Sequence, residues 1–242
     1  MSNTVFEFRE FTIFQEKCAM KVGTDGVLLG AWCSGPNNMV CPRILDIGTG
    51  TGIIALMCAQ RWTDAQIDAV EIDTEAAAQA SFNFHHSPWS ERLTVHPVSL
   101  SLFHHTHEPV TYDLIVSNPP FYNATLLPDD ERRATARHTN ALPWDELMKI
   151  AGERLSVQGN LCIIFPSSEW DKVVTAAMIH GLSPVRITDV VTRQGKESKR
   201  MLAAFSLQPQ IPARTVLYIR DGAGEYTPTY RKLVGPFYKS LK

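Results

Sequence analysis

Three glycines at alternate positions follow a short apolar run that begins at residue 43. The segment reads DIGTGTG from Asp46 to Gly52, and a stretch with helical apolar spacing comes directly after it. Glycine lets the backbone turn tightly and approach a ligand closely, and the amino terminus of a helix presents N–H groups that lack partners. The spacing therefore predicts a strand, a ligand-binding turn and a helix in succession.

The acidic residues around this turn indicate which ligand it binds. Dinucleotide-binding turns read G-x-G-x-x-G, but the position of the third glycine is Ile53 here. Asp46 suits a cationic ligand better than a pyrophosphate, and D-x-G-x-G-x-G is typical of S-adenosylmethionine enzymes. Glu71 ends the next predicted strand, where a carboxylate can accept both hydrogen bonds of a ribose diol. An NAD-dependent oxidoreductase and a purely structural turn remain as alternatives.

A second motif, NPPF at residues 118–121, follows the strand-like run YDLIVS. Ligands of open α/β sheets bind beyond the carboxyl ends of the strands, so both turns should face one crevice. Two prolines fix the backbone and remove two N–H donors, which leaves the Asn118 side-chain oxygen and the Pro119 carbonyl as acceptors for a planar NH2 group. Phe121 supplies a flat face for a base or an amide. The motif predicts methyl transfer to an amino or amide nitrogen, with positioning in place of a strong base.

The apolar pattern around the motifs predicts the elements that position them. Short apolar runs alternate with amphipathic stretches, which is typical of βαβ units and a parallel sheet. Strands are predicted at Arg43–Ile47, Gln66–Ile72, Leu93–Val98, Tyr112–Ser117, Asn160–Phe165, Val185–Val191 and Met201–Leu207, and helices at Thr51–Arg61, Thr74–Phe84 (capped by Thr74), Pro143–Leu155 and Ser168–His180. The predicted fold class is α/β, with a mostly parallel seven-stranded sheet, helices on both faces and a terminal antiparallel hairpin that closes one edge.

Length and composition restrict the protein class. The 242 residues suffice for one α/β domain with a sizeable core. The apolar runs are far shorter than the roughly 20 residues that span a bilayer, and the amino terminus lacks the apolar core of a secretory signal. Five scattered cysteines without a C-x-x-C pair are typical of reduced thiols. A cytoplasmic protein is therefore expected.

The net charge of −2 is unevenly distributed. Residues 186–242 hold eleven basic and four acidic side chains, a balance of +7, whereas the rest of the chain carries −9. Because phosphates bind cations and unpaired bases stack on aromatics, the candidate RNA contacts are basic residues near aromatics, near the NPPF motif or in the turn before the last predicted strand. These candidates are Arg132, Arg133, Arg137, Lys196, Lys199, Arg200, Arg231 and Lys232. Solvated helix faces and a tail folded on the body are alternatives that charge alone leaves open.

With both motifs in place, residues 28–207 resemble the class I, Rossmann-like S-adenosylmethionine-dependent methyltransferases that carry an N-P-P-[FY] signature. Within that class the chain is most similar to the bacterial tRNA (valine) adenine-N6 methyltransferase family. The similarity lies in FTIFQ at residues 11–15, MKVGTDGVLLGAW at residues 20–32, RH at residues 137–138 and the aromatic-basic ending. The resemblance implies that the adenosine 3′ of the anticodon is flipped into a pocket at residues 118–121 and methylated on N6.

The resemblance also implies roles for single residues. The expected cofactor contacts are Asp46, Gly48 and Gly50 at the methionine part of S-adenosylmethionine, Glu71 at its ribose, Ser99 at its adenine, and Asn118 beside the target. Many relatives have an acidic residue where this chain has Ser99, so the contact with adenine would be weaker here. Segment 21–25 is expected to close over the cofactor through Lys21, Thr24 and Asp25. The expected catalytic residues are Asn118, Pro119 and Phe121.

Three parts of the chain follow from this reading. Residues 1–40 are expected to form an extension that caps the cofactor site, residues 41–208 the methyltransferase core, and residues 209–242 a basic and aromatic tail on the same domain. A monomer is favoured. No metal ion is expected, because the histidines at 85, 86, 104, 105 and 107 lack an accompanying cysteine or a helix-spaced carboxylate. An rRNA guanine-N2 methyltransferase, a protein glutamine-N5 methyltransferase and a non-catalytic RNA-binding module remain open.

Overall fold

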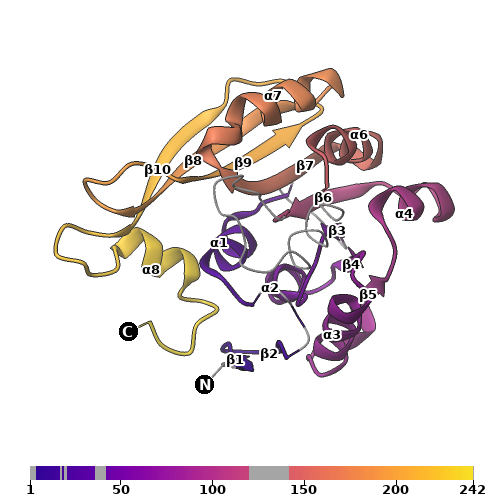
Figure 1. The fold of residues 1–242 in the computed structure, drawn as a ribbon, viewed down its shortest axis with the longest axis horizontal. Coiled ribbons are helices and arrows are strands. Elements are labelled where there is room, and N and C mark those ends of the chain that lie inside the picture. The colour runs from indigo at the N-terminus through magenta and orange to yellow at the C-terminus, as the bar shows by residue number, and fades with distance from the viewer. Residues whose placement is uncertain (1–3, 17, 19–20, 36–41, 120–141, 242) are drawn as a thin grey trace, which may run out of the picture.

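The computed structural model describes residues 4–16, 18, 21–35, 42–119 and 142–241. Its centre is a sheet in the order β10-β8-β9-β7-β6-β3-β4-β5 (Figure 1). The strands are β3 (Arg43–Ile47), β4 (Gln66–Val70), β5 (Leu93–His96), β6 (Tyr112–Ser117), β7 (Leu155–Pro166), β8 (Ser183–Arg193), β9 (Arg200–Ser206) and β10 (Ala213–Arg220). Every neighbouring pair is parallel except those of β9, which is antiparallel to β7 and to β8. The predicted α/β class and mostly parallel sheet are confirmed.

The part of the sheet formed by the last three strands, β8, β9 and β10, differs from the prediction. The predicted hairpin is β8–β9, but β9 lies between β7 and β8, so the hairpin does not close an edge. An eighth strand, β10, forms that edge, with Ala213 opposite Arg186 and Arg220 opposite Arg193 of β8. Most side chains of β10 are exposed, so the strand lacks the apolar pattern of the other seven, and the pattern missed it.

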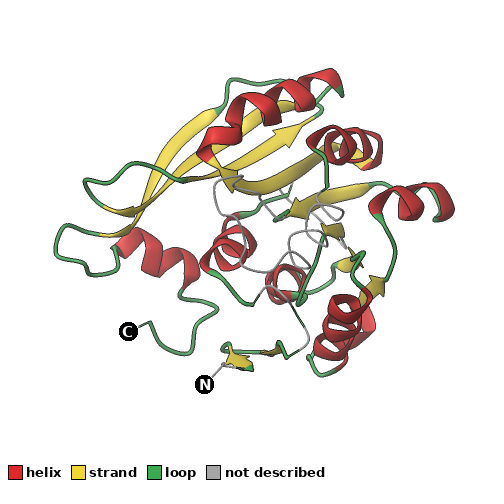
Figure 2. Ribbon diagram, in the orientation of Figure 1, coloured by secondary structure: helices red, strands yellow, loops and turns green. Residues whose placement is uncertain are grey.

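Helices cover both faces of the sheet, as predicted (Figure 2). One face packs against α1 (Thr24–Trp32), α2 (Ile53–Arg61), α3 (Thr74–His85) and α8 (Pro228–Val234). The other packs against α4 (Leu100–Thr106), α6 (Trp144–Arg154) and α7 (Trp170–Ile179). The other helical segments among the described residues are the 3-10 turns Ser90–Arg92 and Ser167–Glu169. Each face of the sheet thus buries its own apolar cluster.

The cap of α3 corrects one prediction. Thr74 is the first helical residue, and Asp73 before it is the N-cap. Its Oδ1 accepts hydrogen bonds from the backbone N–H groups of Glu75 and Ala76 at 2.9 and 3.0 Å. A carboxylate in this position also interacts favourably with the helix dipole, which explains why the chain uses the aspartate one position earlier.

The first residues form a small antiparallel sheet, β1 (Val5–Glu7) and β2 (Thr12–Phe14), beside the carboxyl-terminal end of the chain (Figure 1). The backbone N–H of Arg9 donates to the carbonyl of Phe237 at 2.7 Å. Asn83 of α3 holds β2 through two bonds, from Phe14 N to its Oδ1 and from its Nδ2 to Phe14 O, both 2.9 Å. Its Nδ2 also donates to the Thr51 carbonyl at 2.8 Å, so this small sheet is fixed to the glycine turn.

Candidate functional site

The glycine turn and the NPPF motif begin side by side. We call the edge where the parallel strands end the carboxyl edge. There Ile47 of β3 pairs with Val70 of β4 and with Ser117 of β6. The next residues along these three strands are Gly48, Glu71 and Asn118. Strand register therefore brings three of the residues singled out in the sequence to one place.

The three glycines of the turn have two different uses. Gly48, Gly50 and Gly52 all adopt positive φ, at 69°, 56° and 84°, a conformation that other residues rarely tolerate. A Cβ at Gly48 or Gly50 would meet no atom of the described residues within 4 Å, whereas a Cβ at Gly52 would lie 2.5 Å from Phe84 Cε1. The first two glycines thus border open space, and the third makes room for the packing of α3.

Asp46 is fully buried at the end of β3, and its two oxygens have different surroundings. Oδ2 accepts hydrogen bonds from Thr49 Oγ1 at 2.6 Å and from Ala55 N at 3.2 Å. Oδ1 is buried with no hydrogen-bond partner among the described residues. Burial raises the pKa of Asp46 to about 7, opposed by these two hydrogen bonds and assisted by the charge of Glu71. A buried carboxylate with one unsatisfied oxygen fits a cationic ligand that donates hydrogen bonds.

Glu71 is held against the turn by backbone groups. Its Oε2 accepts from Gly50 N at 2.9 Å, and its Oε1 accepts from Asp73 N at 3.0 Å. An ionised carboxylate has about four acceptor positions, so each oxygen can accept one more hydrogen bond. The carboxylate is therefore positioned to receive both hydroxyls of a ribose diol.

The start of the NPPF motif is tied to the glycine side. Ser117 Oγ donates to the carbonyl of Ile47 at 2.9 Å, which joins the end of β6 to the end of β3. Asn118 is half-buried and Pro119 is buried. Phe121 lies outside the described residues. Asn118 therefore follows the end of β6 that is bonded to β3, and it lies next to Gly48 in the register of the two strands.

Comparison with known proteins places the chain in a family. The methyltransferase small domain family matches residues 36–170, which contain both motifs. A tRNA1(Val) (adenine(37)-N6)-methyltransferase of Flavobacterium psychrophilum is 46% identical, over 98% of this chain and 100% of that protein. Proteins of the same name from Bacteroides thetaiotaomicron and Aeromonas hydrophila are 42% and 40% identical, over 99–100% of each chain. The chain belongs to the tRNA1(Val) (adenine(37)-N6)-methyltransferase family. The predicted family is therefore confirmed.

Solved structures of other methyltransferases share the fold of this family member. A predicted O-methyltransferase from Agrobacterium tumefaciens superposes with a TM-score of 0.66 at 17% identity, over 88% of this chain and 96% of that one. A precorrin-6y C5,15-methyltransferase from Geobacter metallireducens gives a TM-score of 0.52 at 13% identity, over 81% and 92%. These likenesses concern the fold alone, and they agree with the Rossmann-like prediction.

S-adenosylmethionine is the methyl donor, as the sequence predicted. The residues at the carboxyl edge fit it on three counts. Gly48 and Gly50 leave space at the turn. Asp46 Oδ1 is buried and lacks a partner within the described residues, which suits a ligand with an ammonium and a sulfonium charge. Glu71 keeps acceptor positions for a ribose.

The segment expected to close over the cofactor, residues 21–25, leads into α1. Lys21 and Thr24 are exposed, and Asp25 is half-buried. Asp25 Oδ2 accepts a hydrogen bond from Arg200 Nε at 2.9 Å, which also makes an ion pair. The sequence had assigned these two residues to different partners, Asp25 to the cofactor and Arg200 to tRNA. The structure pairs these two residues with each other.

Two residues that the sequence analysis missed order the amino-terminal segment. Asn83 fixes β2 to the glycine turn, and the buried Gln15 accepts from Val22 N at 2.7 Å through its Oε1. Cys18 lies between Gln15 and α1 in the sequence and is buried. Burial, together with the charges of Glu71 and Asp73, raises the pKa of its thiol to about 11. Polar residues in otherwise apolar or alanine-rich runs, as at Asn83, are the signal that could have identified them.

Ser99, the predicted adenine contact, also has a structural role. It is the N-cap of α4, and its Oγ accepts from Leu102 N at 3.1 Å. The hydroxyl hydrogen stays available for a further bond. Ser99 follows β5, the neighbour of β4, and so lies on the Glu71 side of the glycine turn.

The predicted tRNA contacts fall into three groups. Lys196 and Lys199 are exposed in the turn between β8 and β9, at the carboxyl edge. Arg231 is exposed on α8 and donates to the carbonyls of Tyr226 and Leu241 at 3.1 and 3.3 Å, while Lys232 beside it is exposed. Arg132, Arg133 and Arg137 lie outside the described residues.

The histidines at 104 and 105 belong to α4, a helix that the apolar pattern did not predict. Arg154 Nε donates to His104 Nδ1 at 3.1 Å, and Arg154 Nη1 donates to the Glu108 carbonyl at 2.7 Å. Arg154 thereby ties α6 to the end of α4. Across the described residues, no three histidine, cysteine or carboxylate side chains are grouped so as to hold a metal ion.

Every helix in the described part of the chain is too short or too polar to cross a lipid bilayer.

Proposed function

We propose that this chain transfers the methyl group of S-adenosylmethionine to N6 of adenosine 37 in tRNA1(Val), the activity for which its full-length relatives are named. The observation that supports this most strongly is the register of β3 and β6, which leaves Gly48 and Asn118 adjacent at the carboxyl edge. A donor site and an amide that can hold an amino group are then next to each other. We assign the reaction to a monomer in the cytoplasm.

The donor side binds and orients the cofactor. Bound S-adenosylmethionine supplies a methyl group activated by its sulfonium charge. In this proposal Asp46 Oδ1 accepts from the amino group of the methionine part, and the backbone of Gly48 and Gly50 approaches that part closely. Glu71 accepts both ribose hydroxyls while Gly50 N and Asp73 N hold its carboxylate in place. Further cofactor contacts are proposed for Lys21, Thr24, Ser99 and Asn118, and Asp25 is proposed to position the segment over the cofactor.

The acceptor side orients the target nitrogen. The Asn118 side-chain oxygen and the Pro119 carbonyl accept the two N6–H bonds of adenine, which turns the nitrogen lone pair toward the methyl group. Because the nitrogen becomes acidic only as the new bond forms, its proton can pass to water without a dedicated base. Phe121 is proposed to stack on the flipped base. The Ser117–Ile47 bond keeps this side at a fixed distance from the glycine turn.

The surroundings of the site would hold the RNA and cover the cofactor. We propose phosphate contacts for the exposed Lys196, Lys199, Arg231 and Lys232, and for Arg132, Arg133 and Arg137. Residues 1–40 would cap the cofactor site, since the hydrogen bonds of Gln15 and Asn83 order parts of that segment beside the turn. Residues 41–208 would then supply the catalytic core and residues 209–242 part of the RNA surface.

The proposal is tested by methyl transfer from labelled S-adenosylmethionine to bulk tRNA, followed by nucleoside analysis. Label in N6-methyladenosine supports it. Label in N2-methylguanosine would indicate that the acceptor is guanine. Label in a protein substrate but not in RNA would indicate that the acceptor is a glutamine amide. A protein that binds tRNA but neither binds the cofactor nor transfers label would be a binding module and would contradict the proposal.

A further inference from the structure

Helix α1 is held at both ends by arginines from the β8–β9 hairpin. At its carboxyl-terminal end, Arg186 of β8 stacks on the Trp32 ring, with Cζ 3.7 Å from the centroid, and donates to the Trp32 carbonyl at 2.7 Å. At its amino-terminal end, Arg200 of β9 binds Asp25. Both contacts have the favourable sign for the helix dipole, with a cation at the last carbonyls and a carboxylate in the first turn. The hairpin therefore fixes where α1 lies.

The first turn of α1 lies against the helix that follows the glycine turn. A Cβ on Gly26 would be 3.4 Å from Ile53 Cγ2, the first residue of α2. Gly30, one turn further, approaches Met57 of α2 so closely that a Cβ there would lie 2.7 Å from its Sδ. A displacement of the amino-terminal turn of α1 would therefore be transmitted to the start of α2, where the cofactor turn ends.

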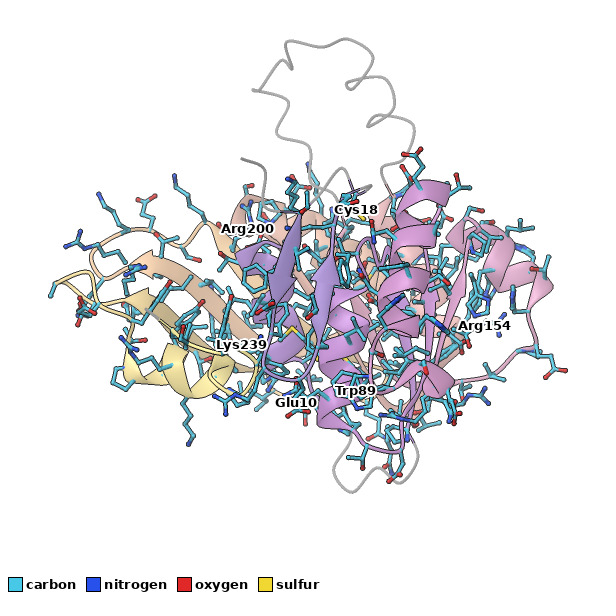
Figure 3. The ribbon with its side chains drawn as sticks, turned by 90° about the horizontal axis from the view of Figure 1, so that it is seen from below. Glu10, Cys18, Trp89, Arg154, Arg200 and Lys239 are labelled. Atoms are coloured by element: carbon cyan, nitrogen blue, oxygen red, sulfur yellow. The ribbon has the colours of Figure 1, made fainter. Side chains whose placement is uncertain are left out.

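Strand pairing and hydrogen bonds hold the backbone of Arg200 in place. It opens β9 opposite Pro166 of β7 and Val190 of β8. Ser198 Oγ bonds the carbonyls of Val190 and Arg200 at 3.1 and 2.8 Å, and Ser167 Oγ donates to the Ser198 carbonyl at 2.8 Å. The same hairpin carries the exposed Lys196 and Lys199. Figure 3 shows Arg200 and Cys18 toward one side of the molecule, and Trp89 and Lys239 toward the other.

We infer that Arg200 is a positioning residue of the donor side and not a phosphate contact. Through Asp25 it fastens the amino-terminal turn of α1 beside the glycine turn, so that the segment over the cofactor keeps its place. Arg200 then differs in role from Lys199, its neighbour in sequence. This inference rests on the proposed function for its effect on methyl transfer, but the Asp25–Arg200 coupling itself can be measured without cofactor or RNA.

The test is a double-mutant cycle on R200Q and D25N, with three readouts for each variant: the Kd of S-adenosylmethionine by calorimetry, the Kd of tRNA, and amide exchange in the first turn of α1. We expect each single variant to raise the cofactor Kd about three- to tenfold, because a half-exposed ion pair couples modestly. The double variant should be no worse than either one alone, and the Val27 amide, which donates to the Gly23 carbonyl, should exchange faster in all three. R200K, which keeps the charge, should recover part of the cofactor affinity.

Two control variants separate this role from a general one. Arg214 makes a two-bond ion pair with Asp189 at 2.8 and 3.1 Å within the same part of the sheet, and R214Q should leave the cofactor Kd unchanged. K199Q should weaken tRNA binding alone. If R200Q behaves like K199Q, Arg200 is a phosphate contact and the inference is wrong. Additive effects of R200Q and D25N would also overturn it. A wild-type protein that fails to bind the cofactor would instead count against the proposed function, and the amide-exchange cycle would still decide the coupling.

Discussion

The proposed donor side and the proposed RNA side of the carboxyl edge are built in different ways. On the donor side Asp46 and Glu71 are buried, and their carboxylates are held by backbone N–H groups and by Thr49. On the RNA side Lys196 and Lys199 are exposed on a hairpin. Buried, hydrogen-bonded carboxylates have one geometry, whereas exposed lysines adapt to a partner. Single substitutions should therefore act strongly on the donor side and weakly on the RNA side.

The largest effect is expected at the junction of the two sides. Asn118→Ala should lower kcat for methylation of tRNA by about 100-fold or more, because one preorganised contact to the reacting group is lost. The cofactor Kd should change less than about threefold. Single-turnover kinetics with calorimetry measures both quantities. Asn160→Ala is a matched control, because the Asn160 amide bonds the Ser34 carbonyl away from the edge. Retention of full turnover by Asn118→Ala would contradict the proposed mechanism.

Substitution of two glycines in the same turn should have different effects, one on cofactor binding and the other on folding stability. Gly50→Ala should raise the cofactor Kd about 30-fold, since its Cβ would enter the open space beside Glu71, at a cost of about 1 kcal/mol from positive φ. Gly52→Ala should lower the free energy of unfolding by about 3 kcal/mol, because its Cβ would collide with Phe84. Urea titration and calorimetry separate the two effects. Equal destabilisation by both variants, with unchanged Kd, would argue against a ligand at Gly50.

Asp46 should make cofactor binding depend on pH. Its pKa is raised to about 7 by burial, so the carboxylate that would attract a cation is mostly protonated at pH 6 and mostly ionised at pH 8. The cofactor affinity should therefore rise about tenfold over that range. Without cofactor, the contribution of Asp46 to the stability of the folded protein changes with pH in the opposite direction. The raised pKa stabilises the folded protein below about pH 4, and this stability is lost as the pH rises through about 7.

Calorimetry at several pH values tests this on the wild type and on Asp46→Asn. The variant cannot titrate at this position and should bind with an affinity that varies little between pH 6 and pH 8. A wild-type affinity that is equally flat would show that Asp46 does not face the charge of the cofactor.

The smallest effect is expected on the RNA side. Reversal of charge at Lys196 and Lys199 together should raise the Kd of tRNA about fivefold and make its salt dependence shallower by about one to two phosphates. The cofactor Kd should stay the same, since neither lysine touches the donor side. Filter binding at several salt concentrations measures the slope. An unchanged tRNA affinity would place the RNA elsewhere on the molecule.

The geometry around the glycine turn could be predicted from the sequence because its residues are close along the chain. Asp46, Gly50 and Glu71 fall within one βαβ unit, where local turn chemistry and apolar patterning determine the geometry. The same patterns missed β10, whose side chains are mostly exposed, and α4, a helix of only 7 residues. The Asp25–Arg200 pair was also missed, because its partners are 175 residues apart. Only the packing of α1 between the hairpin and α2 brings them together, and nothing in local spacing encodes it.

The most direct test of the proposed reaction uses two tRNA1(Val) transcripts that differ at nucleotide 37 alone, one with adenosine and one with guanosine. We expect the adenosine transcript to accept methyl label, recovered as N6-methyladenosine at that position, and the guanosine transcript to accept none. Equal label on both transcripts, or label mapped to another nucleotide, would contradict methylation of adenosine 37.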